Sequence, residues 1–89
     1  MNDSHSSGPI YACIAISPDR EVQVGPVPSW EEALAVEEVM RERISELLAA
    51  EDLIREVDGE IVGAERWDAL HDETLQRGLE RFSERLRAH

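Results

Sequence analysis

The side chains best suited to chemistry in this sequence lie close together in its C-terminal third. Asp68, His71 and Asp72 stand at positions i, i+3 and i+4, and Glu65 precedes them by about one helical turn. On a helix this spacing places three carboxylates and an imidazole on part of one surface, as in di-iron bundles, where facing helices add further carboxylates. A single histidine is a sparse ligand set for a transition metal. We therefore expect a solvated acidic face here, with no bound metal.

Other kinds of catalytic chemistry have weaker support. Cys13 lies inside the apolar run from Ile10 to Ile16, where a buried core thiol is expected rather than a nucleophile, and as the single cysteine it can form no internal disulfide. Three serines have no base at a recognisable spacing, namely Ser29, Ser45 and Ser83. No glycine-rich phosphate-binding loop is present. The sequence predicts a protein that is not an enzyme and uses no cofactor.

Charge limits the range of partners. The 89 residues carry 20 Asp and Glu against nine arginines and no lysine, a formal net charge of -11. This balance repels nucleic-acid phosphates and anionic lipid surfaces. The apolar run near the start is too short to span a bilayer, and no positively charged signal region precedes it. We expect a cytoplasmic protein that contacts neither nucleic acid nor membrane directly.

The length of the chain predicts one small α+β domain over residues 10–89, after a disordered leader over residues 1–9. A chain of this size buries only about 60 to 65% of its unfolded surface. Its hydrophobic core is therefore thin, and association with a partner or with a second copy would add stability. We expect a homodimer.

The first two predicted elements are strands. The run IYACIAI is rich in β-forming residues, and Ser17-Pro18-Asp19 separates it from REVQVG, in which apolar and polar residues alternate. These features predict an N-terminal β-hairpin. Its first strand is apolar on both faces, so both faces require cover.

A helix is expected to begin directly after the segment Gly25-Pro26-Val27-Pro28, whose glycine and prolines stop the second strand. Ser29 occupies the N-cap position, with Glu32 three residues later to complete a capping box. An apolar stripe then recurs at spacings of three and four, through Ala33, Val36, Met40, Ile44 and Leu47.

Residues 53–63 allow two interpretations. The helical stripe continues through Leu53 and Val57 toward Gly59, which would suit a helix C-cap. The same residues also read as a second hairpin around Asp58-Gly59, a strong turn signal. The poor alternation of apolar and polar residues within residues 53–57 favours the helix. A second helix is predicted from about Ala64 to the C-terminus, burying a stripe that includes Trp67, Leu70 or His71, Leu75, Leu79, Phe82 and Leu86.

A spacing of 38 residues suggests an internal repeat. Glu42-Arg43-x-Ser45-Glu46-x-Leu48 recurs as Glu80-Arg81-x-Ser83-Glu84-x-Leu86. The chain would then be a duplicated ββα unit forming one small antiparallel sheet of four strands under two helices. The alternative is that helices built from Glu, Arg and Leu match each other by chance.

Two functions remain after these exclusions. The first is a regulator or adaptor that binds another protein. Trp30 stands off the apolar stripe beside Pro28 and is expected either to be exposed as an interface anchor or to fold over the hairpin as core. The residues expected to make the contact are Trp30, Glu31, Glu38, Glu42 and Phe82.

The second function is an inhibitor that mimics nucleic acid. The glutamates that rise along one side of the first helix would imitate a row of phosphates. These are Glu31, Glu38, Glu42 and Glu46. The two arginines between them, Arg41 and Arg43, interrupt the negative surface.

Overall fold

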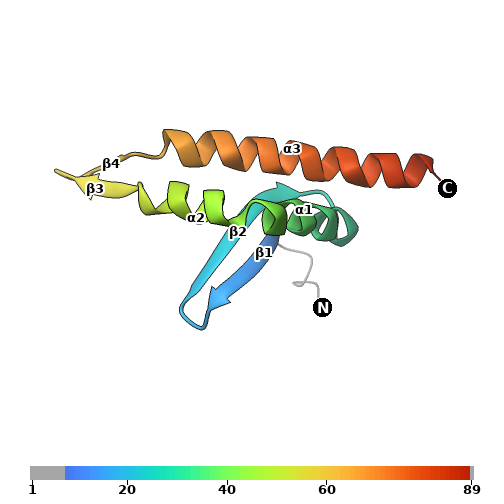
Figure 1. The fold of residues 1–89 in the computed structure, drawn as a ribbon, viewed down its shortest axis with the longest axis horizontal. Helices are drawn as coiled ribbons and strands as arrows, with labels where there is room; N and C mark the ends of the chain where they lie inside the picture. The colour runs from blue at the N-terminus through green and yellow to red at the C-terminus, as the bar shows by residue number, and fades with distance from the viewer. Residues whose placement is uncertain (1–7, 89) are drawn as a thin grey trace.

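The computed structural model describes residues 8–88 and has an α+β fold (Figure 1). Its elements in chain order are β1 (Ile10–Ser17), β2 (Arg20–Val27), α1 (Trp30–Glu42), α2 (Ile44–Asp52), β3 (Arg55–Val57), β4 (Glu60–Val62) and α3 (Glu65–Arg87). The fold class predicted from the sequence is confirmed. Residues 1–7 of the predicted leader lie outside the described residues.

The predicted N-terminal hairpin is present. β1 and β2 pair antiparallel, and Val22 and Val24 are buried while Glu21 and Gln23, which alternate with them, are exposed. The prediction that Gly25 and the prolines end β2 is wrong, because the strand continues to Val27. The register shifts at this point, and such irregularities are the places where a strand tolerates proline.

α1 begins as its cap predicts, but it is shorter than the apolar stripe suggests. Ser29 is the N-cap, and its hydroxyl oxygen accepts a hydrogen bond from the Glu32 amide at 3.2 Å. The helix ends at Glu42, and Arg43 has φ -130° and ψ 31° before α2 begins at Ile44. One predicted helix is therefore two helices that share a stripe.

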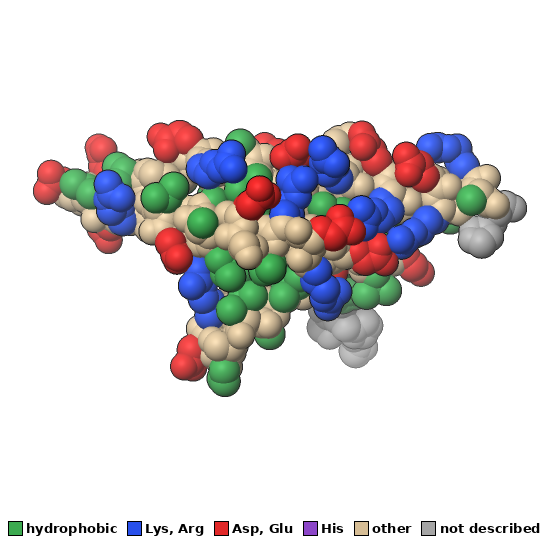
Figure 2. Space-filling model, viewed as in Figure 1, with side chains coloured by type: hydrophobic (Ala, Val, Ile, Leu, Met, Phe, Trp, Pro, Cys, Tyr) green, Lys and Arg blue, Asp and Glu red, His purple; other side chains and the backbone are tan. Residues whose placement is uncertain are grey.

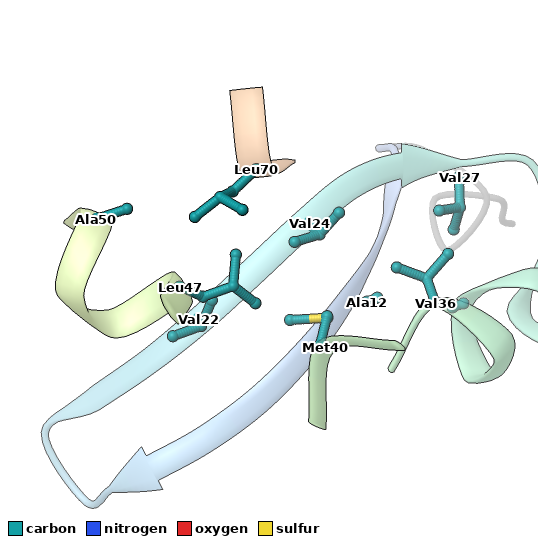
Figure 3. Packing of buried hydrophobic residues seen from close by; sticks show 10 residues of the cluster. Ala12, Val22, Val24, Val27, Val36, Met40, Leu47, Ala50 and Leu70 are labelled. Atoms are coloured by element: carbon teal, nitrogen blue, oxygen red, sulfur yellow. The ribbon is translucent and has the colours of Figure 1, made fainter. Parts of the chain in front are cut away.

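The core lies where the first hairpin meets the three helices. Figure 3 shows side chains from β1, β2, α1, α2 and α3 directed into one space. The buried cluster consists of Ala12, Val22, Val24, Val27, Ala33, Val36, Met40, Leu47, Ala50 and Leu70. Arg20 also ties the end of the hairpin to α2, because its Nη2 atom lies 2.9 Å from both Glu51 Oε1 and Asp52 Oδ1.

α3 packs on α1 through small residues. Its fully buried or nearly buried positions are Leu70, Thr74 and Gly78. A Cβ atom on Gly78 would overlap Val36, so the two helices approach closely at this glycine. The prediction that Leu79, Phe82 and Leu86 would be buried is wrong, because the first two are half-buried and Leu86 is 60% exposed.

The second hairpin replaces the helix that the sequence favoured for residues 53–57. α2 ends at Asp52, and β3 and β4 pair antiparallel around Asp58 and Gly59. Both turn residues have positive φ, 53° and 80°, as a tight type I′ hairpin turn requires. The Asp-Gly signal therefore outweighed the apolar spacing, and Gly59 is a turn residue rather than a helix cap.

The order strand, strand, helix occurs twice, as the repeat hypothesis requires, but the two hairpins do not form one sheet. β1 pairs with β2 and β3 pairs with β4 in two separate two-stranded sheets. The single four-stranded sheet that the repeat hypothesis implied is therefore not formed. The strands of the first hairpin have eight residues each and those of the second have three.

Candidate protein-interaction surface

The most exposed large apolar side chains of α1 stand one turn apart. Trp30 is 68% exposed and Leu34 is 61% exposed. Residues at i and i+4 lie on the same face of a helix, so the two side chains form a ridge, called here the Trp30–Leu34 ridge. The structure thus decides between the two positions considered for Trp30, which is exposed and not part of the core.

The ridge is held by the start of the helix. Ser29 accepts from the Glu32 amide, and its hydroxyl donates to Glu32 Oε1 at 2.8 Å. On the opposite side of the helix, Val36 and Val39 are buried. The helix therefore presents Trp30 and Leu34 to solvent from a fixed backbone, which lowers the conformational entropy lost on binding.

Two of the predicted contact residues are engaged within the molecule. Glu38 accepts from both guanidinium nitrogens of Arg85, at 2.7 and 3.0 Å, and contacts Arg81 at 3.4 Å. Glu42 accepts two hydrogen bonds from Arg81, at 2.9 and 3.1 Å. Bidentate arginine pairs of this kind connect α1 to α3 with defined geometry.

These contacts change the electrostatics of the acidic row. The hydrogen bond from Arg85 lowers the pKa of Glu38, and the hydrogen bond from Arg81 lowers the pKa of Glu42. Both carboxylates stay ionised, but their charge is neutralised by the arginines of α3. Of the predicted row, Glu31 and Glu46 have no ion pair among residues 8–88.

The residues that the sequence suggested as metal ligands do not converge. His71 Nε2 lies 3.2 Å from the amide nitrogen and 3.1 Å from the carbonyl oxygen of Gly25, so the ring packs against the end of β2. Its Nδ1 atom lies 3.2 Å from Asp72 Oδ1. Within residues 8–88 no three acidic, histidine or cysteine side chains form a group that would hold a metal ion.

The expectation that Cys13 is a core thiol is wrong. Its side chain is half-buried, and its thiol donates to Glu21 Oε1 at 3.0 Å. This hydrogen bond, with some desolvation and the negative charge of Glu21, raises the pKa of Cys13 to about 11. Because a thiolate is required for nucleophilic attack, the raised pKa of Cys13 lowers the reactivity expected of the thiol near neutral pH.

The thiol should therefore become more reactive when its acceptor is removed. Glu21→Gln is expected to lower the pKa of Cys13 toward the ordinary value of about 8.5, and to raise its alkylation rate at pH 8 by roughly tenfold or more. Reaction with iodoacetamide, followed by mass spectrometry, measures the rate. Gln23→Glu adds a second acidic residue directly opposite Cys13 and should not accelerate the reaction. Equal rates in wild type and Glu21→Gln would contradict the assigned hydrogen bond.

Comparisons with protein families, with curated protein sequences and with solved structures find no match to this chain. In the described part of the chain, every helix is too short or too polar to cross a bilayer.

Leu34 is the member of the ridge that the sequence reasoning missed. It follows Trp30 by four residues and stands off the stripe of Ala33, Val36 and Met40. That spacing was the available signal. Phe82, by contrast, is half-buried on α3 and is at most a partial contributor to a free surface.

Proposed function

We propose that the chain is a small protein-interaction module, a cytosolic regulator or adaptor that binds another protein through the Trp30–Leu34 ridge. The observation that carries this proposal is the exposure of both side chains on one face of a capped helix. A tryptophan beside a rigid proline segment is a typical centre for an interface, because it buries a large area with little loss of side-chain entropy.

The surroundings of the ridge fit this function. Glu31 is exposed next to Trp30, and Arg41 lies 3.8 Å from Glu37 further along the same helix. A polar rim around an apolar centre is the usual composition of an interface between separately stable proteins. Specificity would come from these charged groups and affinity from the two apolar side chains.

The alternative, an inhibitor that mimics nucleic acid, has less support. A mimic needs a continuous row of unpaired carboxylates, whereas Glu38 and Glu42 are paired with arginines of α3. The two functions respond differently to salt. Binding through an apolar anchor is nearly independent of ionic strength, and mimicry weakens steeply as the Debye length falls from about 10 Å at 0.1 M to about 3 Å at 1 M.

Trp30→Ala is expected to reduce partner affinity by about 30-fold or more, as the loss of an interface hot spot does. The melting temperature should change little, because the side chain is already 68% exposed. The test is affinity capture from native cytosol at two salt concentrations, followed by calorimetry with the captured protein. Ile16→Ala, at an exposed apolar position on β1, is the matched control and should bind as wild type.

A captured protein that binds Trp30→Ala as tightly as wild type would contradict the proposed site. If high salt abolishes capture by the wild type, the mimic is the better explanation. A large drop in melting temperature for Trp30→Ala would instead mean that the side chain stabilises the fold in solution.

We also propose that the chain forms a homodimer through α3. Leu75, Leu79, Phe82 and Leu86 recur at spacings of four, three and four, which is the pattern of a helix that pairs with another helix. Leu75 packs on the core, while the stripe becomes more exposed toward Leu86. The C-terminal half of α3 therefore carries apolar surface that one copy does not cover.

Phe82→Glu and Leu86→Glu are expected to shift the protein from dimer to monomer at micromolar concentration. Leu86→Glu is the cleaner variant, because Leu86 is 60% exposed and its replacement leaves the core intact. Analytical ultracentrifugation measures the mass, and Ser83→Glu, outside the stripe, is the control for added charge. A monomeric mass for the wild type at several hundred micromolar would remove the dimer.

A further inference from the structure

The second hairpin is an isolated structural element. Its residues 55–62, called here the β3–β4 arm, project from the end of the molecule beyond the start of α3 (Figure 1). Each strand has three residues, and neither is paired with any other strand of the described chain. A two-stranded hairpin of this size is marginally stable by itself.

The arm is nevertheless held in a defined position. Asp58 and Gly59 form its tight turn, with φ values of 53° and 80°. At its base, Gly63 lies so close to the backbone carbonyl of Leu53 that a Cβ atom would overlap that oxygen. The two ends of the arm therefore lie against each other, between the end of α2 and the beginning of α3.

Both faces of the arm carry an exposed apolar side chain. Val57 lies opposite Glu60, and Ile61 lies opposite Glu56. Residues directly opposite each other share a face of the hairpin and successive residues alternate, so Val57 and Ile61 are on opposite faces. Their exposed fractions are 45% and 66%, which leaves an uncovered apolar group on each face.

The edges of the arm are also open. Val57 and Glu60 flank a two-residue turn and form the closing hydrogen-bonded pair. The next pair along the ladder, Glu56 and Ile61, is then a non-hydrogen-bonded pair, whose N–H and C=O groups point outward from the two strands. The outward backbone groups of β4 thus belong to the residue with the most exposed apolar side chain of the arm.

The charge of the arm selects the partner. Glu56, Asp58 and Glu60 outnumber Arg55, and among residues 8–88 none of these acidic groups forms an ion pair. Figure 2 shows acidic side chains around hydrophobic ones at this end of the molecule. Two copies of the arm would repel each other, whereas a segment rich in lysine or arginine would be attracted.

We propose that the β3–β4 arm is a second binding site, which takes an extended basic segment of a partner protein as an added strand along β4. The main chain of the segment bonds to the outward N–H and C=O of Ile61. An apolar side chain of the segment covers Ile61, and the basic side chains that alternate with it approach Glu60 on the opposite face. The contact is small, so the complex is transient. This site is independent of the Trp30–Leu34 ridge.

The test is an NMR titration of the full chain with a short capped peptide of alternating lysine and valine. The amide shifts are expected to change most at Ile61 and its neighbours within residues 55–63. Ile61→Ser should weaken binding about tenfold, as expected for the loss of one buried isoleucine side chain. Ile16→Ser, at an exposed isoleucine on β1, should leave binding unchanged.

Two further measurements separate this site from general attraction to an acidic protein. A peptide of alternating lysine and serine has the same charge without apolar groups and should bind at least about tenfold more weakly. The contact between the α-protons of residues 56 and 61, which a non-hydrogen-bonded pair brings together, reports that the hairpin of Ile61→Ser is still formed.

The proposal is overturned if the shifts spread evenly over the acidic residues of the chain, or if they centre on Trp30 and Leu34. Equal binding of the two peptides, or wild-type affinity for Ile61→Ser, overturns it as well. If the α-proton contact is lost in Ile61→Ser, the milder variant Ile61→Thr, which keeps a β-branched side chain, replaces it under the same criteria.

Discussion

Gly78→Ala is expected to lower the free energy of unfolding by about 2 to 3 kcal/mol, the usual effect of inserting an atom into a closely packed site. The sign is the opposite of what helix propensity alone gives, because alanine favours a helix interior over glycine by about 1 kcal/mol. Thermal and urea unfolding measure the change. It is a large fraction of the total stability of a domain of this size.

The physical reason is the close approach of α3 to α1. A Cβ atom on Gly78 would overlap the Cγ2 atom of Val36 and would lie 2.6 Å from the Val36 Cα. A side chain can rotate away, but the Cα belongs to the backbone of α1, so the two helices would have to separate. The bidentate pairs from Arg81 to Glu42 and from Arg85 to Glu38 span the same interface and oppose this movement.

Two controls make the interpretation specific. Ser83→Ala, at an exposed position of the same helix, should be neutral or slightly stabilising. Val36→Ala removes the Cγ2 contact but leaves the Val36 Cα in place, and it costs stability by itself because Val36 is buried in the core. The loss caused by Gly78→Ala should therefore be nearly as large in the Val36→Ala background as in the wild type. Gly78→Ala with wild-type or higher stability would show that the helices are further apart in solution.

Local signals in the sequence were sufficient to predict where several helices and strands begin or end. The first hairpin follows from β-forming runs around Ser17-Pro18-Asp19, and the beginning of α1 follows from the hydrogen-bonding capacity of Ser29. The break at Arg43 has no such signal, because Met40, Ile44 and Leu47 continue one apolar stripe across it. The structure shows the break as the non-helical φ and ψ of Arg43.

The buried face of α3 shows a different limit. The large apolar side chains of α3 predicted that Leu79, Phe82 and Leu86 would be buried. The structure instead buries Thr74 and Gly78, and Gly78 lies against Val36 of α1. Threonine and glycine are not residue types that predict a hydrophobic core position. The hydroxyl of Thr74 is buried without a hydrogen-bond partner in the described structure. Close helix contact selects small residues, and a pattern based on large apolar side chains cannot identify them.

The residues of the candidate sites could be predicted only in part from the sequence. The position of Trp30 off the apolar stripe left exposure and burial over the hairpin both open, and the structure shows that Trp30 is exposed. The same position off the stripe could have identified Leu34. The pairing of Glu38 with Arg85 and of Glu42 with Arg81 joins residues 47 and 39 positions apart and depends on the packing of α3 on α1. The sequence therefore indicated the acidic row and could not show that much of it is neutralised.

Gly63→Ala is the second substitution with a large expected effect, and Gly59→Ala is its matched control. Both glycines have φ of 80°, a conformation that costs a residue with a Cβ atom about 1 to 2 kcal/mol. Nothing lies within 4 Å of a Cβ atom on Gly59, so strain is its whole effect. On Gly63 the same atom would overlap the Leu53 carbonyl oxygen and lie 3.0 Å from the Leu53 carbonyl carbon.

Gly63→Ala should therefore destabilise the fold by about 2 kcal/mol more than Gly59→Ala, the difference being the overlap alone. Because the overlap is between two backbone segments, relief requires the end of α2 to move away from the beginning of α3, which releases the base of the β3–β4 arm. Hydrogen exchange should show faster exchange in residues 53–63 for Gly63→Ala, whereas Gly59→Ala affects the turn alone. Equal losses of stability in the two variants would mean that Gly63 and the Leu53 carbonyl are not in contact, and that the arm is attached by its two chain connections without a fixed base.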